Sequence, residues 1–268
     1  MKTNSKKKIL LIVLLVIVLL IGAIVAIFAV NASKNLKAMH AVIDAGLDTL
    51  DDHSTVTPCE STEYTDITMY GVMKFHTDQY RVEGLGNLSV MTTTMGMMQM
   101  VSFMVTPFEK QVPLCAMDFM YVLGNRKSYV EFYDLVPETT TAEYTAVLDT
   151  LRELQADYEG IDELPASENW YDSYLTVMMH KSLDRANDEL NQQIFCDSLG
   201  RYLEASKELP ANSPEDAAAQ LAIIEEYSNG LIEKGGVSTD VFKKALGEDT
   251  TRDFFNKVFF GTDNYRAN

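Results

Sequence analysis

Near its N-terminus the chain has 22 consecutive residues without a charge, Ile9 to Val30, composed almost wholly of Leu, Ile, Val and Ala. At a rise of about 1.5 Å per residue, a helix of this length covers the roughly 30 Å hydrocarbon core of a bilayer. A helix in a soluble core usually keeps a polar face, and this segment has none. The sequence therefore predicts that residues 9–30 span a membrane, so that the rest of the chain folds on one side of it.

The flanks of this segment predict an uncleaved anchor and its orientation. A cleaved secretory signal has an apolar region of about 7 to 15 residues, which is shorter than this one, although Val30 and Ala32 resemble a weak cleavage site. Four lysines precede the segment and two follow it closely. Because the more basic flank tends to stay in the cytoplasm, we expect residues 1–8 to be a cytoplasmic tail. The C-terminal domain would then lie outside the cytoplasm, on a single-pass protein of the cell membrane.

The net charge argues against nucleic acids as partners. The chain carries −17, and residues 1–30 hold four lysines and no acid, so residues 31–268 carry −21. Proteins that bind DNA or RNA gather Lys and Arg on the binding surface, whereas the negative charge of residues 31–268 would repel the phosphates. The 47% of hydrophobic and 23% of charged residues are typical of a folded domain, and 238 residues suffice for one large core.

Cysteine and histidine are too scattered to predict a metal site. The three cysteines allow one disulfide at most, and none of the four histidines is paired at helical metal-ligand spacing. The sequence also lacks a P-loop, a GxSxG and a GxGxxG motif. We therefore expect no metal and no bound cofactor.

The spacing of apolar residues predicts where the helices and strands lie. Within residues 33–50, apolar residues recur every three or four positions, which indicates an amphipathic helix leaving the membrane. From Tyr64 to Leu135 apolar residues alternate with period two between turn signals, which predicts an antiparallel meander of four to six strands. These would cover about residues 67–76, 80–85, 88–94, 97–105, 114–123 and 128–135.

After Pro137 the period is mainly helical, with helices expected over 142–158, 182–207 and 214–234, two short ones near the end, and one strand over 174–179. Ser213 before Pro214 is a suitable helix start, and Ser238 and Gly247 bracket the next helix. Each apolar face of a sheet needs a covering layer. We therefore expect an α+β fold, an antiparallel sheet with helices on both faces (an α/β/α sandwich), in residues 64–268, joined by a helix and linker over 31–63 to one transmembrane helix.

Two stretches carry a resemblance to a known family. In the first, Pro107 through Pro137, a proline-flanked loop precedes a strand that bears Asp118, and the stretch closes with Asp-Leu-Val-Pro. The second, Lys234 to Phe260, contains Lys-Gly-Gly-Val-Ser-Thr-Asp-Val-Phe, a Gly-Glu turn and a Val-Phe-Phe ending. In order and spacing they resemble the ferredoxin-dependent bilin reductases over about residues 64–261. The resemblance implies the same sandwich, here with an added N-terminal membrane anchor.

The resemblance also implies a site at Asp118, which falls on the catalytic Asp of that family. From the residues alone, a carboxyl on an apolar strand is desolvated and can keep its proton near neutral pH. The alternative is that Asp118 only hydrogen-bonds the backbone at a strand end. The family's His position falls on Ser102, and its Asn-Asp pair falls on Gly235 and Gly236, so these three would contact the ligand without carrying protons. The family's Glu falls near Ser89 or Val90, neither of which is acidic, and only a shifted alignment would place Glu83 there.

A methionine-rich face adjoins this Asp. By strand alternation Met98, Met100 and Met104 share a face with Ser102, and Met120 lies on a nearby strand. Methionine is polarizable and adaptable and suits a broad planar ligand, whereas simple core filling is the alternative. The resemblance thus implies a linear tetrapyrrole as the ligand.

Two functions remain open from the sequence, besides that of a structural membrane protein without a ligand, which the lack of a cavity beside Asp118 would favour. In the first, a membrane-anchored extracytoplasmic domain binds a linear tetrapyrrole or related planar ligand and reduces it, with Asp118 as the proton donor. In the second, a noncatalytic ligand-binding or scaffold module keeps the same fold. Members of the family take electrons from ferredoxin, which is acidic and cytoplasmic, so it is not the expected partner of a domain that carries −21. An enzyme would need another, extracytoplasmic electron donor.

Overall fold

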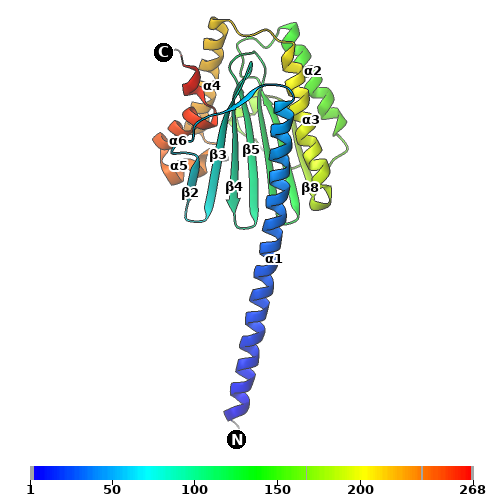
Figure 1. The fold of residues 1–268 in the computed structure, drawn as a ribbon, viewed down its shortest axis with the longest axis vertical. Coiled ribbons are helices and arrows are strands. Elements are labelled where there is room, and N and C mark those ends of the chain that lie inside the picture. The colour runs from blue at the N-terminus through cyan, green and yellow to red at the C-terminus, as the bar shows by residue number, and fades with distance from the viewer. Residues whose placement is uncertain (1–2, 167, 237, 267–268) are drawn as a thin grey trace.

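An antiparallel sheet forms the centre of the molecule in a computed structural model, which describes residues 3–166, 168–236 and 238–266. Its eight strands have the order β1-β3-β4-β5-β6-β7-β8, and β2 also pairs with β3 (Figure 1). From β3 to β7 each strand pairs with the next one in the chain, which confirms the predicted meander. The strands are β1 (Val56–Pro58), β2 (Asp66–Met69), β3 (Met73–Val82), β4 (Gly86–Met95), β5 (Met98–Pro107), β6 (Leu114–Val122), β7 (Asn125–Tyr133) and β8 (Leu175–Asp184).

Helices cover both faces of the sheet, so the predicted α/β/α sandwich is confirmed. One face packs on α1 (Thr3–Asp51), α2 (Ala142–Asp157) and α3 (Asp188–Lys207). The other packs on α4 (Pro214–Lys234), α5 (Thr239–Leu246), α6 (Glu248–Phe254) and a π-helical turn, η3 (Phe255–Phe259). Short 3₁₀ turns complete the chain: η1 (Trp170–Tyr174), η2 (Arg185–Asn187) and η4 (Thr262–Tyr265).

Period-two alternation sends neighbouring residues of one strand into different cores. On β5, Phe103 joins the core under α1 and α3, where its ring meets Phe195 edge-on at 5.1 Å between centroids. Met104, the next residue, joins the core under α4 to α6. Ser102 and Asp118 therefore lie on the α4–α6 face.

Capping residues start and end the helices that cover this second face. The Ser213 hydroxyl accepts a hydrogen bond from the Asp216 amide, and Pro214 occupies the first turn of α4. Gly247 ends α5 with φ +87°, a conformation that glycine adopts without strain. The predicted starts and ends of these two helices are confirmed.

The N-terminal helix α1 is one continuous helix of 49 residues, whose first half projects away from the domain (Figure 1). By length and composition it can cross a membrane, and its apolar residues between 10 and 30 are exposed. From Asn35 onward one stripe is buried on the sheet and α3, through Met39, Val42 and Leu50. A Cβ on Gly46 would lie 2.4 Å from the Phe195 ring, so a side chain there would push α1 off α3.

A buried arginine connects α1 to the domain. Arg126 on β7 has no exposed side-chain surface, and its guanidinium donates two hydrogen bonds, of 2.5 and 3.1 Å, to the Asp188 carboxylate at the start of α3. It also donates to Asn35 Oδ1 of α1 at 3.1 Å. Three elements that are distant in sequence therefore meet at one cation.

We predict that Asp188→Ala lowers the free energy of unfolding by about 3 to 5 kcal/mol, because it leaves the buried Arg126 guanidinium without its counter-charge. Urea denaturation followed by Trp170 fluorescence measures this change. Asp149→Ala is the matched control, since the Asp149–Arg152 pair is exposed and contributes only about 0.5 kcal/mol. Equal effects of the two variants would show that the Arg126 network is not needed for stability.

Candidate functional site

Five strands place one residue each in a row across the α4–α6 face. In the register of the sheet Met91 pairs with Ser102, Ser102 with Asp118, Asp118 with Tyr129, and Tyr129 with His180. The Ser102 hydroxyl donates a hydrogen bond to the Asp118 carboxylate. The row therefore brings polar, titratable groups from β5 to β8 onto one line through the middle of the sheet.

A cavity of about 120 Å³ lies between this row and the C-terminal helices. The sheet contributes its polar floor, and the wall is mostly aromatic, from η1, α4, α5, α6 and η3. The lining residues are Met91, Ser102, Met104, Ala116, Asp118, Glu131, Tyr133, Tyr171, Tyr227, Leu231, Gly236, Ser238, Thr239, Phe242, Phe254, Phe255, Phe259 and Phe260.

Burial raises the pKa of Asp118 from its ordinary value of 3.8 to about 7. The hydrogen bond from Ser102 lowers this pKa in part, and the negative charge of Glu131 raises it. The residue keeps some solvent contact, but its carboxyl is surrounded by protein. Asp118 can therefore bind and release a proton near neutral pH, which a general acid requires. Its partner is the Ser102 side chain, not the backbone, so the strand-end alternative does not describe it.

The sequence analysis missed a second acid in the cavity. Glu131, two residues beyond Tyr129 on the same face of β7, lines the cavity. One carboxylate oxygen lies 2.8 Å from His180 Nε2 on β8, and the other accepts a hydrogen bond of 2.6 Å from the Tyr133 hydroxyl. The alternation of Tyr129, Glu131 and Tyr133 along the strand is the only sequence signal that indicates this group. Glu131 and His180 form an acid–imidazole pair beside Asp118. The site therefore contains an imidazole although the family's His position is occupied by Ser102.

The structure brings some of the predicted ligand-binding residues to the cavity. Ser102, Met104 and Gly236 line it together with Asp118. Met100 and Met120 pair with each other one row closer to the β4–β5 turn, and Met98 lies one row further. These three methionines are on the same face and partly exposed, outside the cavity lining.

Gly235, the remaining predicted residue, has a structural contact outside the cavity lining. Its carbonyl accepts a hydrogen bond of 2.7 Å from Trp170 Nε1, and its φ is +92°. The same indole packs so closely on α4 that a Cβ at Gly230 would lie 2.4 Å from it. Trp170 thus fixes the C-terminal end of α4, from which the chain turns into the cavity wall.

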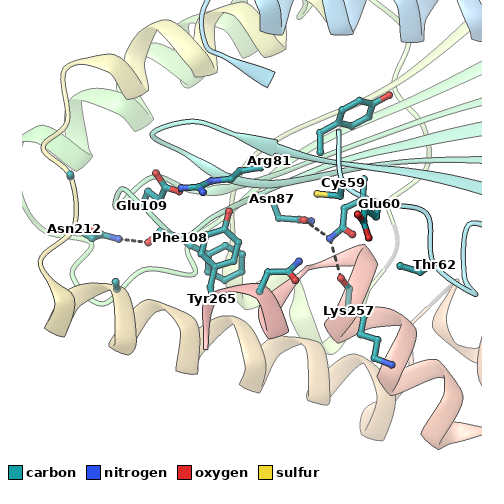
Figure 2. Close-up of a pocket in the computed structure, with 15 residues that line it drawn as sticks. Cys59, Glu60, Thr62, Arg81, Asn87, Phe108, Glu109, Asn212, Lys257 and Tyr265 are labelled. Atoms are coloured by element: carbon teal, nitrogen blue, oxygen red, sulfur yellow. Dashed lines mark hydrogen bonds and ion pairs between the residues drawn. The ribbon is translucent and has the colours of Figure 1, made fainter. Parts of the chain in front are cut away.

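A larger cavity of about 890 Å³ lies at the edge of the sheet where β3 ends and β4 begins (Figure 2). Four of its polar side chains bind one another in pairs, Gln79 with Asn87 and Arg81 with Glu109. Gln79 Nε2 donates to Asn87 Oδ1 at 2.7 Å and to the Lys257 carbonyl at 3.0 Å, and Arg81 pairs with Glu109 at 3.2 Å. These contacts connect the C-terminal segment to the sheet, and no residue predicted for the site lines this cavity.

Neither a metal centre nor a disulfide occurs among the described residues. Within residues 3–166, 168–236 and 238–266, no three His, Cys, Asp or Glu side chains gather where they could hold a metal. Cys59, Cys115 and Cys196 are all free thiols.

The comparisons with known proteins show the fold. No protein-family model and no curated protein matches the sequence. The chain is similar in structure to the crystal structure of phytochromobilin synthase from tomato in complex with biliverdin, with a TM-score of 0.69 and 14% identity, over 85% of each chain. The chain therefore has a fold similar to that of this synthase, which agrees with the fold implied by the resemblance around Asp118 and Gly236.

We predict that the Asp118 carboxyl makes stability fall as pH rises. Its folded-state pKa of about 7 lies above 3.8, so between these values the folded protein holds a proton that the unfolded chain has released. The contribution is complete below pH 3.8 and is lost as the pH passes 7. Asp118→Asn should therefore raise stability by about 1 to 2 kcal/mol at pH 8 and change it little near pH 4.

Thermal unfolding of both proteins at the two pH values measures this effect. Asp134→Asn is a matched control, because the carboxylate of Asp134 accepts a hydrogen bond from the Tyr144 hydroxyl and lies outside the cavity lining. A stabilisation by Asp118→Asn that is the same at both pH values would contradict the raised pKa.

Proposed function

We propose that this chain is a membrane-anchored protein whose C-terminal domain binds a linear tetrapyrrole or a related planar ligand between the sheet and helices α4 to α6. The observation that carries the proposal is a carboxyl with a pKa of about 7 in a cavity walled by aromatic rings, within a bilin-reductase fold. Aromatic faces suit a flat conjugated molecule. The biliverdin bound to the tomato enzyme supports a linear tetrapyrrole as the ligand class.

The anchor is α1, with its lysine-rich N-terminus in the cytoplasm and the domain outside. The support is the exposed, uncharged surface of residues 10–30 and the larger number of lysines before them.

Ligand binding requires the cavity to widen. Pockets for ligands of this size measure about 300 to 1,000 Å³, whereas the cavity measures about 120 Å³. The sheet is a continuous hydrogen-bonded meander, while α5 and α6 are short helices that follow the turn at Gly235 and Gly236. We infer that these helices move outward when the ligand enters. Part of the binding free energy is then spent on this opening.

Reduction of one double bond of the ligand consumes two electrons and two protons. Asp118 is about half protonated at neutral pH and would donate the first proton, while the Glu131–His180 pair is the second proton-handling group at the cavity. The electrons must come from outside this chain, through a reduced flavin or a membrane redox protein. Ferredoxin, which is itself acidic, is not the expected donor because residues 31–268 carry −21.

We predict a saturable, red-shifted absorbance band when the full chain in detergent is titrated with biliverdin. Ala116→Leu, which adds bulk to the cavity floor, should weaken binding about tenfold. Arg81→Ala, in the larger cavity, is the matched control and should bind as the wild type does. A flat titration would contradict the ligand class, and weakening by Arg81→Ala alone would move the site to the other cavity.

If the domain is a reductase, we predict that bound biliverdin is reduced when a reduced flavin is added to the complex under anaerobic conditions. Asp118→Asn should slow the loss of the biliverdin band by about 10²-fold or more while binding persists, because a neutral amide cannot donate the proton. Glu131→Gln should slow it less if Asp118 donates first. Binding without any flavin-dependent turnover would instead establish the noncatalytic ligand-binding module on the same fold.

A further inference from the structure

Three turns of the sheet lie together at the edge from which the free half of α1 leaves the domain (Figure 1). They join β2 to β3, β4 to β5, and β6 to β7. The last pairs before these turns are Met69 with Met73, Met95 with Met98, and Val122 with Asn125, so the three turns lie at the same end of the strands. We call residues 69–74, 94–99 and 121–127 the turn edge.

The turn edge exposes large apolar side chains that the fold does not use. Tyr70 is 57% exposed, Val72 63% and Leu123 39%, and Met95 is exposed as well. Outside α1, Met178 is the only other large hydrophobic side chain among the described residues with this degree of exposure. Such clustering at one edge marks an interaction surface.

The backbone at two of these positions is strained. Tyr70 has φ +52° and Leu123 has φ +56°, and within the described part of the chain they are the only residues other than glycine with positive φ. Glycine or asparagine would adopt this conformation at lower free energy. The sequence instead keeps a bulky apolar residue at this position in the β2–β3 and β6–β7 turns, whereas the β4–β5 turn has Gly96, and stability of the fold does not explain the two bulky residues.

The charge of the turn edge differs from that of the rest of the domain. The three turns, residues 69–74, 94–99 and 121–127, contain no Asp or Glu, although the chain has 39, and they include Lys74 and Lys127. The acids beside them are Asp184, which pairs with Asn125 at the end of β8, and Asp188, whose charge Arg126 neutralises. Turns at the opposite edge carry acids such as Glu83 and Glu109. The composition of the turn edge suits a bilayer with anionic headgroups, whereas the net negative charge of the rest of the domain would be repelled by such a bilayer.

Hydrogen bonds fix the turn edge at the level where the apolar segment of α1 ends. That segment ends at Val30, and Arg185 Nη2 bonds both Asn31 Oδ1, at 2.8 Å, and the Leu123 carbonyl. One helical turn further, Asn35 Nδ2 donates to the Met97 carbonyl at 3.3 Å. The β4–β5 and β6–β7 turns therefore lie beside the first residues of α1 that follow its apolar segment, and the β2–β3 turn lies at the same end of the sheet (Figure 1). This is the depth at which aromatic side chains favour the membrane interface.

We propose that the turn edge docks on the lipid bilayer, with Tyr70, Val72 and Leu123 inserted among the headgroups. The domain then stands on the membrane with the sheet upright, instead of moving freely on a tether. This inference rests on the membrane-anchoring part of the proposed function and is independent of ligand binding.

Spin labels on the full chain in vesicles of phosphatidylcholine and phosphatidylglycerol test this docking. Labels are attached at Val72→Cys and Leu123→Cys, with Glu83→Cys at the opposite edge as the matched control, in a background where Cys59 and Cys196 are replaced by Ser. We expect the two turn-edge labels to relax with oxygen several-fold more, relative to a water-soluble nickel chelate, than the Glu83→Cys label does.

A label at Val25→Cys separates the outcomes. If it lies in lipid while the turn-edge labels are as water-accessible as the Glu83→Cys label, docking is wrong and the anchor stands. If the Val25→Cys label is in water, both the anchor and the docking are wrong. Spin–spin broadening between Leu123→Cys labels would show that a second copy of the chain covers the edge, which also overturns the proposal. Biliverdin binding is measured separately and does not affect these readouts.

Discussion

The arrangement of the molecule depends on the hydrogen bonds and the ion pair of the buried Arg126 guanidinium. A fully buried cation needs its counter-charge and hydrogen-bond acceptors nearby, and here Asp188 of α3 and Asn35 of α1 supply them. Because Arg126 lies on β7 beside a turn of the sheet, satisfying it fixes both the packing of α3 on the sheet and the point at which α1 leaves the domain. The projecting half of α1 is thus held at a defined place, with its apolar segment ending at Val30, five positions before Asn35.

The two faces of the sheet serve different purposes. The face under α1 and α3 is closed by large side chains such as Phe103 and Phe195, which interlock across the interface. The face under α4 to α6 carries Ser102, Asp118 and Glu131, and buried polar groups of this kind need partners or solvent. Neighbouring strands provide the partners there, since Ser102 bonds Asp118 and both His180 and Tyr133 contact Glu131. The small cavity leaves room beside them. The fold can therefore place a desolvated acid at its centre because the opposite face supplies most of the apolar packing.

Local pattern was sufficient to predict much of this fold, and the failures have physical causes. Alternation identified β5 to β7, and cap chemistry identified the ends of α4 and α5. The strand predicted over 67–76 is wrong because the chain turns at Tyr70 to Val72, where an apolar residue adopts the left-handed conformation of a glycine. The helix predicted over 182–207 is confirmed from Asp188 to Lys207, but its predicted start is wrong because residues 182–184 pair with β7. Glu131 and His180 were missed because 49 residues separate partners that only the sheet brings together.

The site and the turn edge are connected along one face of the sheet. Met98, Met100 and Ser102 occupy alternate positions of β5, so about 13 Å of strand leads from the edge to the Asp118 row. The three methionine side chains beside this path, Met98, Met100 and Met120, are partly exposed. An anionic tetrapyrrole in water would be repelled by a domain that carries −21, but the turn edge contains no acid. The path of least repulsion to the cavity therefore begins at the surface that we place on the bilayer, so a sparingly soluble planar ligand would reach Asp118 most easily from lipid.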